Sequence, residues 1–380
     1  MADCQYCPAN STNCSVAYCT RAEGSTRGII IANRQLPGPP IQVCQNDILV
    51  VDVINKIPGH SLSIHWRGQP NHEAPFMDGV PMVTQCPILG YTTFQYKFRA
   101  SSPGTHFYHA HSDSDRTDGL FGALIVRQAD TKEPHRKLYD VDSRDHAVLI
   151  SEWSGDRSLF PEDEDELPKA LLVNGKSPIA SGHALSTFNV EKKKRYRFRV
   201  AYTGGTVGCP VNISVDNHVL KIIAVDGNPI NPYEVKSAEL AKGERLDFIL
   251  KANQALGAYF LRVKSSCNNN DIYGLAIISY NGATLEVKEN NLTETLRHFE
   301  TNFCSSENEK VCLGDIRMVD KIPLEIRKKE VDKQFYLAFN YTMGQIKNDN
   351  KVFGDNLIKK IFNTDPTYNV HVIVNAAICS

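Results

Sequence analysis

Short segments rich in β-branched and aromatic residues recur along most of this chain, and they constrain its fold more than any other feature. Several alternate apolar and polar residues, and Gly, Pro, Asn or Asp separates them. Alternation with a period of two is typical of strands with one buried face. We therefore predict an all-β fold of sandwiches or barrels. The predicted strands are residues 48–54, 94–98, 120–126, 147–150, 196–200, 220–225, 246–250 and 259–263.

An internal repeat indicates two copies of one sandwich. Residues 104–108 followed by 120–126 are echoed by residues 257–261 followed by 272–278, with glycine and aromatic residues at matching places. We expect the first sandwich over residues 20–135 and the second over residues 140–283. The alignment puts Arg262 at the position of His109 and Lys264 at that of His111. Any chemistry of these histidines therefore belongs to the first copy.

Three segments lie outside the two predicted sandwiches. Residues 1–19 form a cysteine-rich N-terminal segment, and residues 284–333 read as a polar connector. Residues 334–380 are a stub of a third domain or a divergent tail, because they are too few for another sandwich of about 100 residues.

Charge and cysteine content narrow the function classes. Lys and Arg number 42 against 43 Asp and Glu, which disfavours a general nucleic-acid binder. No apolar run approaches the roughly 18 to 20 residues of a membrane span. Eleven cysteines and five Asn-x-Ser/Thr motifs predict a secreted, disulfide-bonded glycoprotein. The chain begins without a visible signal peptide, and we attribute this to a missing N-terminus.

Histidines cluster in the first predicted sandwich. Six of the 12 lie between residues 60 and 111. His109 and His111 are two apart, so on a strand both imidazoles project from one face, about 6.6 Å apart along the chain. This spacing suits two neighbouring metal ions better than one, and copper and zinc both accept imidazole. For the pair taken alone, a chance pair on an exposed strand is the alternative.

Further motifs surround the histidines in a fixed order. They are residues 33–47, His65-Trp66-Arg67-Gly68, and residues 77–81, 83–88, 104–111 and 118–126. Together they resemble the first cupredoxin domain of multicopper oxidases, specifically the insect laccase type, and residues 143–283 resemble the second domain. The resemblance implies tandem cupredoxin-like Greek-key β-sandwiches with copper as the cofactor. It also implies that a phenolic or similar small reductant is oxidised while dioxygen is reduced to water.

The resemblance also assigns roles to individual residues. It implies that His65 binds the single type 2 copper, and that His109 and His111 each serve a different type 3 copper. It further implies that Asp78 assists proton delivery to bound oxygen, although an Asp that only forms a turn is the alternative. Three other histidines match no ligand and are predicted to lie in loops or at the surface: His60, His72 and His106.

The chain departs from the family pattern in two ways. Arg67 stands where the family carries a second histidine, the partner of His109 on one type 3 copper. A guanidinium has no lone pair, and at about 4 Å two unit charges repel by roughly 4 kcal/mol at an effective dielectric near 20. We expect Asp78 to pair with Arg67. The sequence also has no His-Cys-His segment to hold the blue copper, and the resemblance implies that the third-domain partner of Cys86 is missing.

Three interpretations stay open. The chain is part of a copper oxidase incomplete at both ends, a copper-free extracellular binding or structural protein built on that scaffold, or a protein that binds a single metal ion without turnover. We expect that the chain alone does not oxidise phenols, because electrons have no entry point. We also predict a disulfide between Cys209 and Cys267, the only cysteines of the second sandwich.

Overall fold

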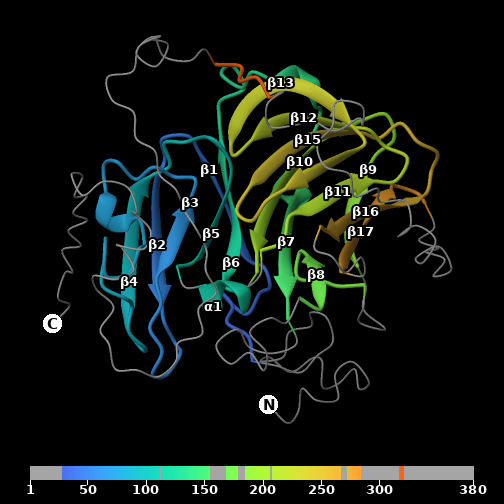
Figure 1. The fold of residues 1–380 in the computed structure, drawn as a ribbon. Coiled ribbons are helices and arrows are strands. Elements are labelled where there is room, and N and C mark those ends of the chain that lie inside the picture. Colours follow the sequence, from blue (N-terminus) through green and yellow to red (C-terminus); the bar gives the residue numbers. More distant parts are fainter. Residues whose placement is uncertain are drawn as a thin grey trace, which may run out of the picture. The chain divides into compact units, whose positions relative to one another are not determined.

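The computed structural model describes residues 28–111, 113–154, 168–178, 185–205, 208–266, 272–283 and 316–320. All of them belong to one compact unit. Strands dominate this part of the chain, so the predicted all-β class is confirmed (Figure 1). None of the described helices has the length and apolar character needed to cross a membrane.

The first sandwich consists of a four-stranded sheet, in the order β1-β6-β5-β3, and a pair of strands, β2 and β4. Its core lies between these two layers and contains Trp66, Tyr96, Phe98 and Leu124. A short helix, α1 (Asp113–Thr117), follows β5. The strands are β1 (Gly38–Cys44), β2 (Ile48–Ile54), β3 (Ile64–Arg67), β4 (Thr93–Arg99), β5 (Gly104–Ala110) and β6 (Phe121–Arg127).

The second sandwich packs a six-stranded sheet, β13-β12-β15-β10-β7-β8, against a five-stranded sheet, β14-β11-β16-β17-β9. Its core includes Phe198 and Phe248, whose rings stack 5.2 Å apart. The strands are β7 (Ala147–Trp153), β8 (Ala170–Val173), β9 (Ser186–Val190), β10 (Arg195–Gly204), β11 (Val211–Val215), β12 (Leu220–Val225), β13 (Asn228–Val235), β14 (Ser237–Leu240), β15 (Arg245–Lys251), β16 (Ala258–Ser265) and β17 (Tyr273–Tyr280).

The repeat predicted from the sequence is visible in the strand order. In the first sandwich β1 runs parallel to β6, β6 antiparallel to β5, and β5 antiparallel to β3. In the second, β9 runs parallel to β17, β17 antiparallel to β16, and β16 antiparallel to β11. Strand β3 therefore corresponds to β11, and β5 to β16. The domain limits at residues 20, 135, 140 and 283 stay predictions.

Strand β5 is buried along its whole length because it has a core on each face. Tyr108 and Ala110 face the interior of the first sandwich. Phe107 instead packs in a separate cluster with Phe121 of β6 and Leu149 of β7. Alternation along the strand therefore places His109 on the same face as Phe107, which is turned toward the second sandwich.

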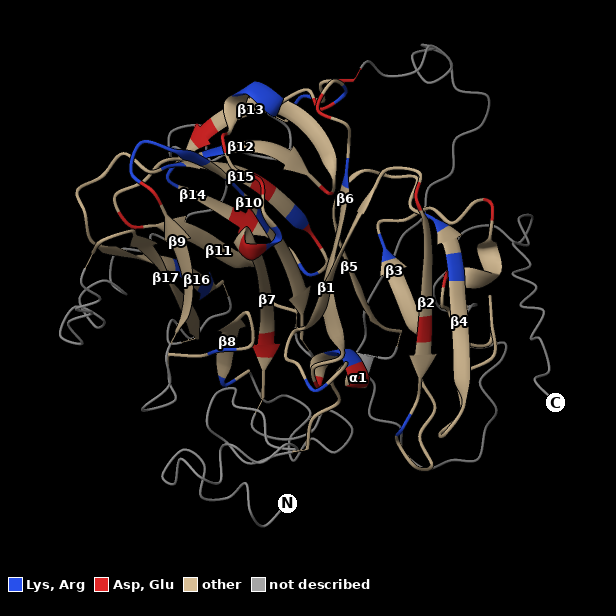
Figure 2. Cartoon of the chain, turned by 180° about the vertical axis from the view of Figure 1, so that it is seen from behind, with Lys and Arg blue, Asp and Glu red and all other residues tan. Residues whose placement is uncertain are grey.

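Buried charged side chains also lie where the two sandwiches meet. Arg199 of β10 donates from Nη1 to Thr105 Oγ1 of β5 at 2.9 Å, and it forms ion pairs with Asp142 and Asp247. Arg197 contacts Asp247 at 2.6 Å. Figure 2 shows these acidic and basic segments side by side on β10 and β15, while most of the strand surface is uncharged. The charges inside this region are therefore compensated by partners.

Two features of the first sandwich differ from simple expectation. Strand β1 was not among the predicted strands, because Pro39 and Pro40 disfavour a strand. It pairs with β6 at the edge of the sheet, where proline is tolerated. Cys44 is free and exposed, so it takes no part in the predicted disulfides.

The disulfide predictions have mixed outcomes. Cys209 is disulfide-bonded, but Cys267 lies outside the described residues, so that pairing stays a prediction. Cys86 is also disulfide-bonded. The expectation that Cys86 lacks a partner is therefore wrong. The predictions for residues 1–19, and for residues 284–333 and 334–380 apart from 316–320, fall outside the described residues.

Candidate metal centre

The pairing of β3 with β5 brings three of the predicted site histidines together. His65 lies directly opposite His109 in the antiparallel register. The ring centroid of His65 is 5.4 Å from that of His109 and 5.4 Å from that of His111. The rings of His109 and His111 are 6.4 Å apart and nearly parallel, at 21°. The three imidazoles therefore share one face of the sheet, as the two-residue spacing predicted for His109 and His111.

Hydrogen bonds determine which ring nitrogen of His65 and of His109 carries the proton and which one keeps a lone pair. His65 donates from Nδ1 to the backbone carbonyl of Asp78 at 2.7 Å, and His109 donates from Nδ1 to the carbonyl of Ala110 at 2.7 Å. A carbonyl only accepts, so each Nδ1 carries the proton and each Nε2 keeps its lone pair. The His109 Nε2 is buried and has no hydrogen-bond partner in the described part of the chain. This is the arrangement that metal-binding histidines adopt.

The protonation of both rings is compatible with metal binding. Burial lowers the pKa of His109 to about 3. Burial also lowers the pKa of His65, although the hydrogen bond to the Asp78 carbonyl opposes this effect. Both rings are therefore neutral near pH 7, as a ligand of a metal ion must be.

Asp78 lies at the edge of this face. It follows a short 3-10 turn (Pro75–Met77), and the next residue, Gly79, has a φ of +89° and packs against the Ile64 carbonyl, where a Cβ would collide. The Asp78 carboxylate is 3.6 Å from His65 Nδ1 and accepts a long hydrogen bond, 3.4 Å, from Asn71. Its side chain keeps 29% exposure, so it connects the imidazole face with solvent.

Arg67 does not make the predicted contact with Asp78. Its Nε donates to the backbone carbonyl of Gly243 in the second sandwich at 3.1 Å, and its guanidinium lies 5.9 Å from the ring centroid of Phe107. Arg245 donates to the same Gly243 carbonyl at 3.0 Å. Gly243 has a φ of +89°, and an added Cβ there would collide with the Arg67 guanidinium. The predicted ion pair is therefore replaced by a contact between the two sandwiches.

The fit of copper to this face is partial. His65 and His109 offer lone pairs on Nε2, and the unpartnered, buried Nε2 of His109 is the observation that favours a metal. Arg67 offers none, and its charge lowers the pKa of both rings further. Within the described ranges, no group of three or more His, Cys, Asp or Glu side chains is arranged to hold one ion. The imidazoles at positions 65, 109 and 111 therefore suit copper, and the guanidinium at position 67 does not.

The other clustered histidines take three different environments. His60 forms a short contact, 2.9 Å, with the buried Asp115, and His72 is exposed in a loop. His106 was predicted to be a loop or surface residue, and this is wrong. It lies on β5, is 1% exposed, and donates from Nε2 to the Ser102 carbonyl at 3.0 Å. Burial lowers the pKa of His106 to about 4.

Comparisons with known proteins agree on one family. Two multicopper oxidase family models match residues 13–131 and 144–283. Laccase-2 of Pleurotus ostreatus is 32% identical over 290 residues, which is 73% of this chain and 53% of that protein. A laccase of Trametes maxima is 32% identical over 338 residues, 85% of this chain and 64% of that protein. The chain thus spans less than two thirds of the length of these relatives.

Solved structures give the same result. The crystal structure of the laccase from Botrytis aclada matches with a TM-score of 0.60 and 30% identity, over 70% of this chain and 51% of that one. These relatives include fungal laccases, and the comparisons do not specify the insect subgroup. The strand order, the copper-compatible histidines and the matched sequences lead to one conclusion: the chain belongs to the multicopper oxidase family and contains two cupredoxin-like domains.

Proposed function

We propose that this chain is the part of a laccase-like copper oxidase that supplies one side of its copper cluster. The proposed reaction oxidises phenolic or similar small reductants and reduces dioxygen to water. The observation that carries the proposal is the buried His109 Nε2, which has a lone pair and no partner within the described residues. The family membership supports copper as the cofactor.

The proposed ligands are His65, His109 and His111. Copper, when bound, supplies one-electron chemistry toward the reductant and dioxygen. The chain's own residues orient the rings: the carbonyls of Asp78 and Ala110 accept from each Nδ1, so that each Nε2 would be free to bind copper. Asp78 is proposed to assist proton delivery to bound oxygen, because its partly exposed carboxylate lies 3.6 Å from the His65 ring.

We further propose that the chain is secreted and glycosylated, and that it does not turn over alone. The motifs for glycosylation and the absence of a His-Cys-His segment in the sequence support these points. Without blue-copper ligands, electrons from a phenol have no route to the His65 and His109 face.

A copper-free structural or binding protein is the second candidate, and one observation favours it. Arg67 bridges the two sandwiches through Gly243 instead of leaving room for a ligand. A chain that had lost copper would keep such a contact, because it stabilises the packing of the domains. Copper retention distinguishes the two candidates.

Reconstitution with copper tests the proposal. We expect the purified chain to bind copper weakly through imidazole nitrogens, which electron paramagnetic resonance detects as nitrogen hyperfine splitting. We also expect no intense absorption near 600 nm and no oxygen uptake with a diphenol. Copper signals without nitrogen coupling would favour the copper-free protein, and oxygen uptake above that of free copper would contradict the proposed lack of turnover.

A further inference from the structure

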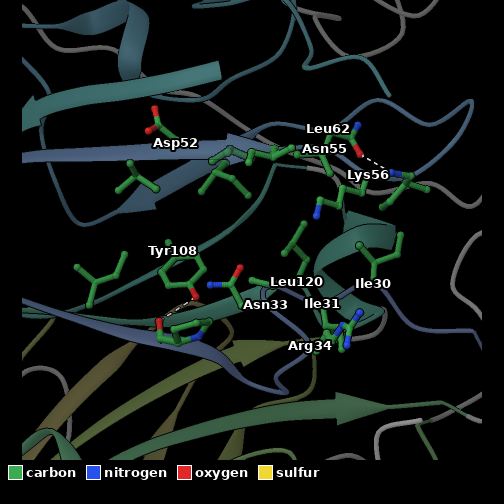
Figure 3. Close-up of a pocket in the computed structure, with 18 of the residues that line it drawn as sticks. Ile30, Ile31, Asn33, Arg34, Asp52, Asn55, Lys56, Leu62, Tyr108 and Leu120 are labelled. Atoms are coloured by element: carbon green, nitrogen blue, oxygen red, sulfur yellow. Dashed lines mark hydrogen bonds between the residues drawn. The ribbon is translucent and has the colours of Figure 1, made fainter. Parts of the chain in front are cut away.

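A cavity of about 800 Å³, open to solvent on one side, lies along β2 of the first sandwich (Figure 3). It is lined by residues from both faces of β2, by β1 and the turn before it, and by residues of β3 and β5 or next to them, including Leu49, Val51, Leu62, Trp66 and Leu120. Its size falls within the roughly 300 to 1,000 Å³ of ligand-binding pockets. The wall is mostly aliphatic and aromatic, so it suits an apolar molecule.

The cavity is separate from the candidate metal centre, although both touch β3. His65 and Arg67 lie on one face of this strand. Trp66 lies on the other face, among the core residues, and lines the cavity. A molecule in the cavity would therefore not contact the imidazoles.

The charges at the cavity are cationic. Arg34 and Lys56 both line it, and Figure 3 shows them at the same end. Asp52 also belongs to the lining, but its carboxylate accepts a hydrogen bond from Gln95 at 2.8 Å, and Figure 3 shows it on the side of β2 away from Tyr108. The charge balance therefore favours an anionic group at the end with Arg34 and Lys56.

The backbone holds Arg34 at this place. Asn33 and Arg34 have φ values of 51° and 61°, and the Gln35 amide closes the turn by donating to the Ala32 carbonyl at 3.0 Å. Two consecutive residues with positive φ form a type I′ turn, which Asn favours and Arg does not. A residue in this strained conformation is a pointer to function.

We propose that this cavity binds a small amphipathic anion, such as a long-chain carboxylate. Its apolar body would lie against the aliphatic and aromatic wall, and its carboxylate would lie near Arg34 and Lys56. Binding requires neither copper nor the residues of the imidazole face.

Competition with a fluorescent amphipathic anion, anilinonaphthalene sulfonate, tests this proposal. We expect oleate to displace the probe from the native chain, and oleyl alcohol to bind about fivefold more weakly because it lacks the charge. Lys56→Gln and Arg34→Gln should each weaken oleate binding roughly threefold to fivefold and leave oleyl alcohol unchanged. Lys97→Gln is the matched control, because Lys97 is exposed on β4 and outside the cavity wall.

A larger side chain inside the cavity gives a second test. Val51→Phe should fill part of the space and weaken both oleate and oleyl alcohol by about tenfold or more. If that variant does not fold, a photoreactive fatty acid on the native chain answers the same question, with labelled peptides expected from β2 and β3. Absence of oleate binding, labelling elsewhere, or an equal effect of Lys97→Gln would overturn the proposal.

Discussion

The equivalent strand pairs of the two sandwiches carry buried polar side chains of different chemistry. In the second sandwich, Arg262 of β16 occupies the place of His109, and its guanidinium donates twice to the Asp216 carboxylate, at 2.6 and 2.7 Å. In the first sandwich, His109 on β5 keeps one nitrogen buried without a partner in the described residues. Both side chains therefore leave one buried nitrogen without a partner among the described residues, Nη1 in Arg262 and Nε2 in His109, but only the His109 nitrogen carries a lone pair that can bind a metal.

The same comparison explains Arg67. The imidazole face of β3 and β5 is turned toward the second sandwich, so a long side chain at position 67 can reach across. The Arg67 guanidinium finds a carbonyl of Gly243 and no carboxylate among the described residues. The arginine thus contributes to domain packing at a position that the sequence resemblance predicts to hold a copper ligand.

The largest expected effect concerns the second sandwich. Asp216→Ala leaves the Arg262 guanidinium buried, with only 5% of its side chain exposed. We expect a loss of about 2 to 3 kcal/mol in the free energy of unfolding, somewhat less than for a fully buried pair because Asp216 is partly exposed. Urea denaturation measures this. Asp130→Ala, which breaks the exposed pair with Arg136, is the control and should leave the free energy of unfolding almost unchanged, because solvent screens this pair.

The contact between the domains should give an intermediate effect. Gly243→Ala introduces a Cβ at a φ of +89° and against the Arg67 guanidinium. We expect a cost of about 1 to 3 kcal/mol, of which at least about 0.5 kcal/mol is recovered when Arg67→Ala is added. Gly59→Ala is the matched control, because its φ is +67° and no atom lies within 4 Å of an added Cβ. Full additivity of Gly243→Ala and Arg67→Ala would show that the two residues do not touch.

The smallest effect should come from the unpartnered histidine itself. His109→Leu removes a buried nitrogen without a partner in the described structure and loses one hydrogen bond to Ala110. These contributions oppose each other, so we expect the stability of the metal-free chain to change by less than about 1 kcal/mol. Thermal and urea unfolding without copper measure this. A loss above about 2 kcal/mol would mean that His109 stabilises the metal-free fold, as we expect the Arg262 and Asp216 pair to do.

The sequence predicts the local geometry of the site better than its long-range contacts. The two-residue spacing of His109 and His111 was enough to place both rings on one face, since a strand alternates regularly. The contact between Arg67 and Gly243 joins residues 176 positions apart, and it depends on how two domains pack. No local sequence pattern predicts such packing. The prediction therefore paired Arg67 with Asp78, which is close in sequence, and this was wrong.

Burial was equally hard to predict for single residues. His106 lies on β5, three residues before His109. The sequence around it does not reveal that side chains on both faces of β5 are buried. The cavity was also not predicted, because its walls come from β2, β3 and a turn before β1. The sequence did indicate that position 67 is unusual, because Arg67 follows His65 within a motif expected to carry a second histidine.

Copper titration of three chains tests the central claim most directly, namely that the imidazole face of β3 and β5 is a copper site weakened at position 67. We predict that Arg67→His binds copper at least about tenfold more tightly than the native chain, because the new imidazole adds a second ligand beside His109. We predict that His109→Leu binds it more weakly than the native chain. Equal affinity in all three chains would contradict the claim, because copper would then bind somewhere other than this face.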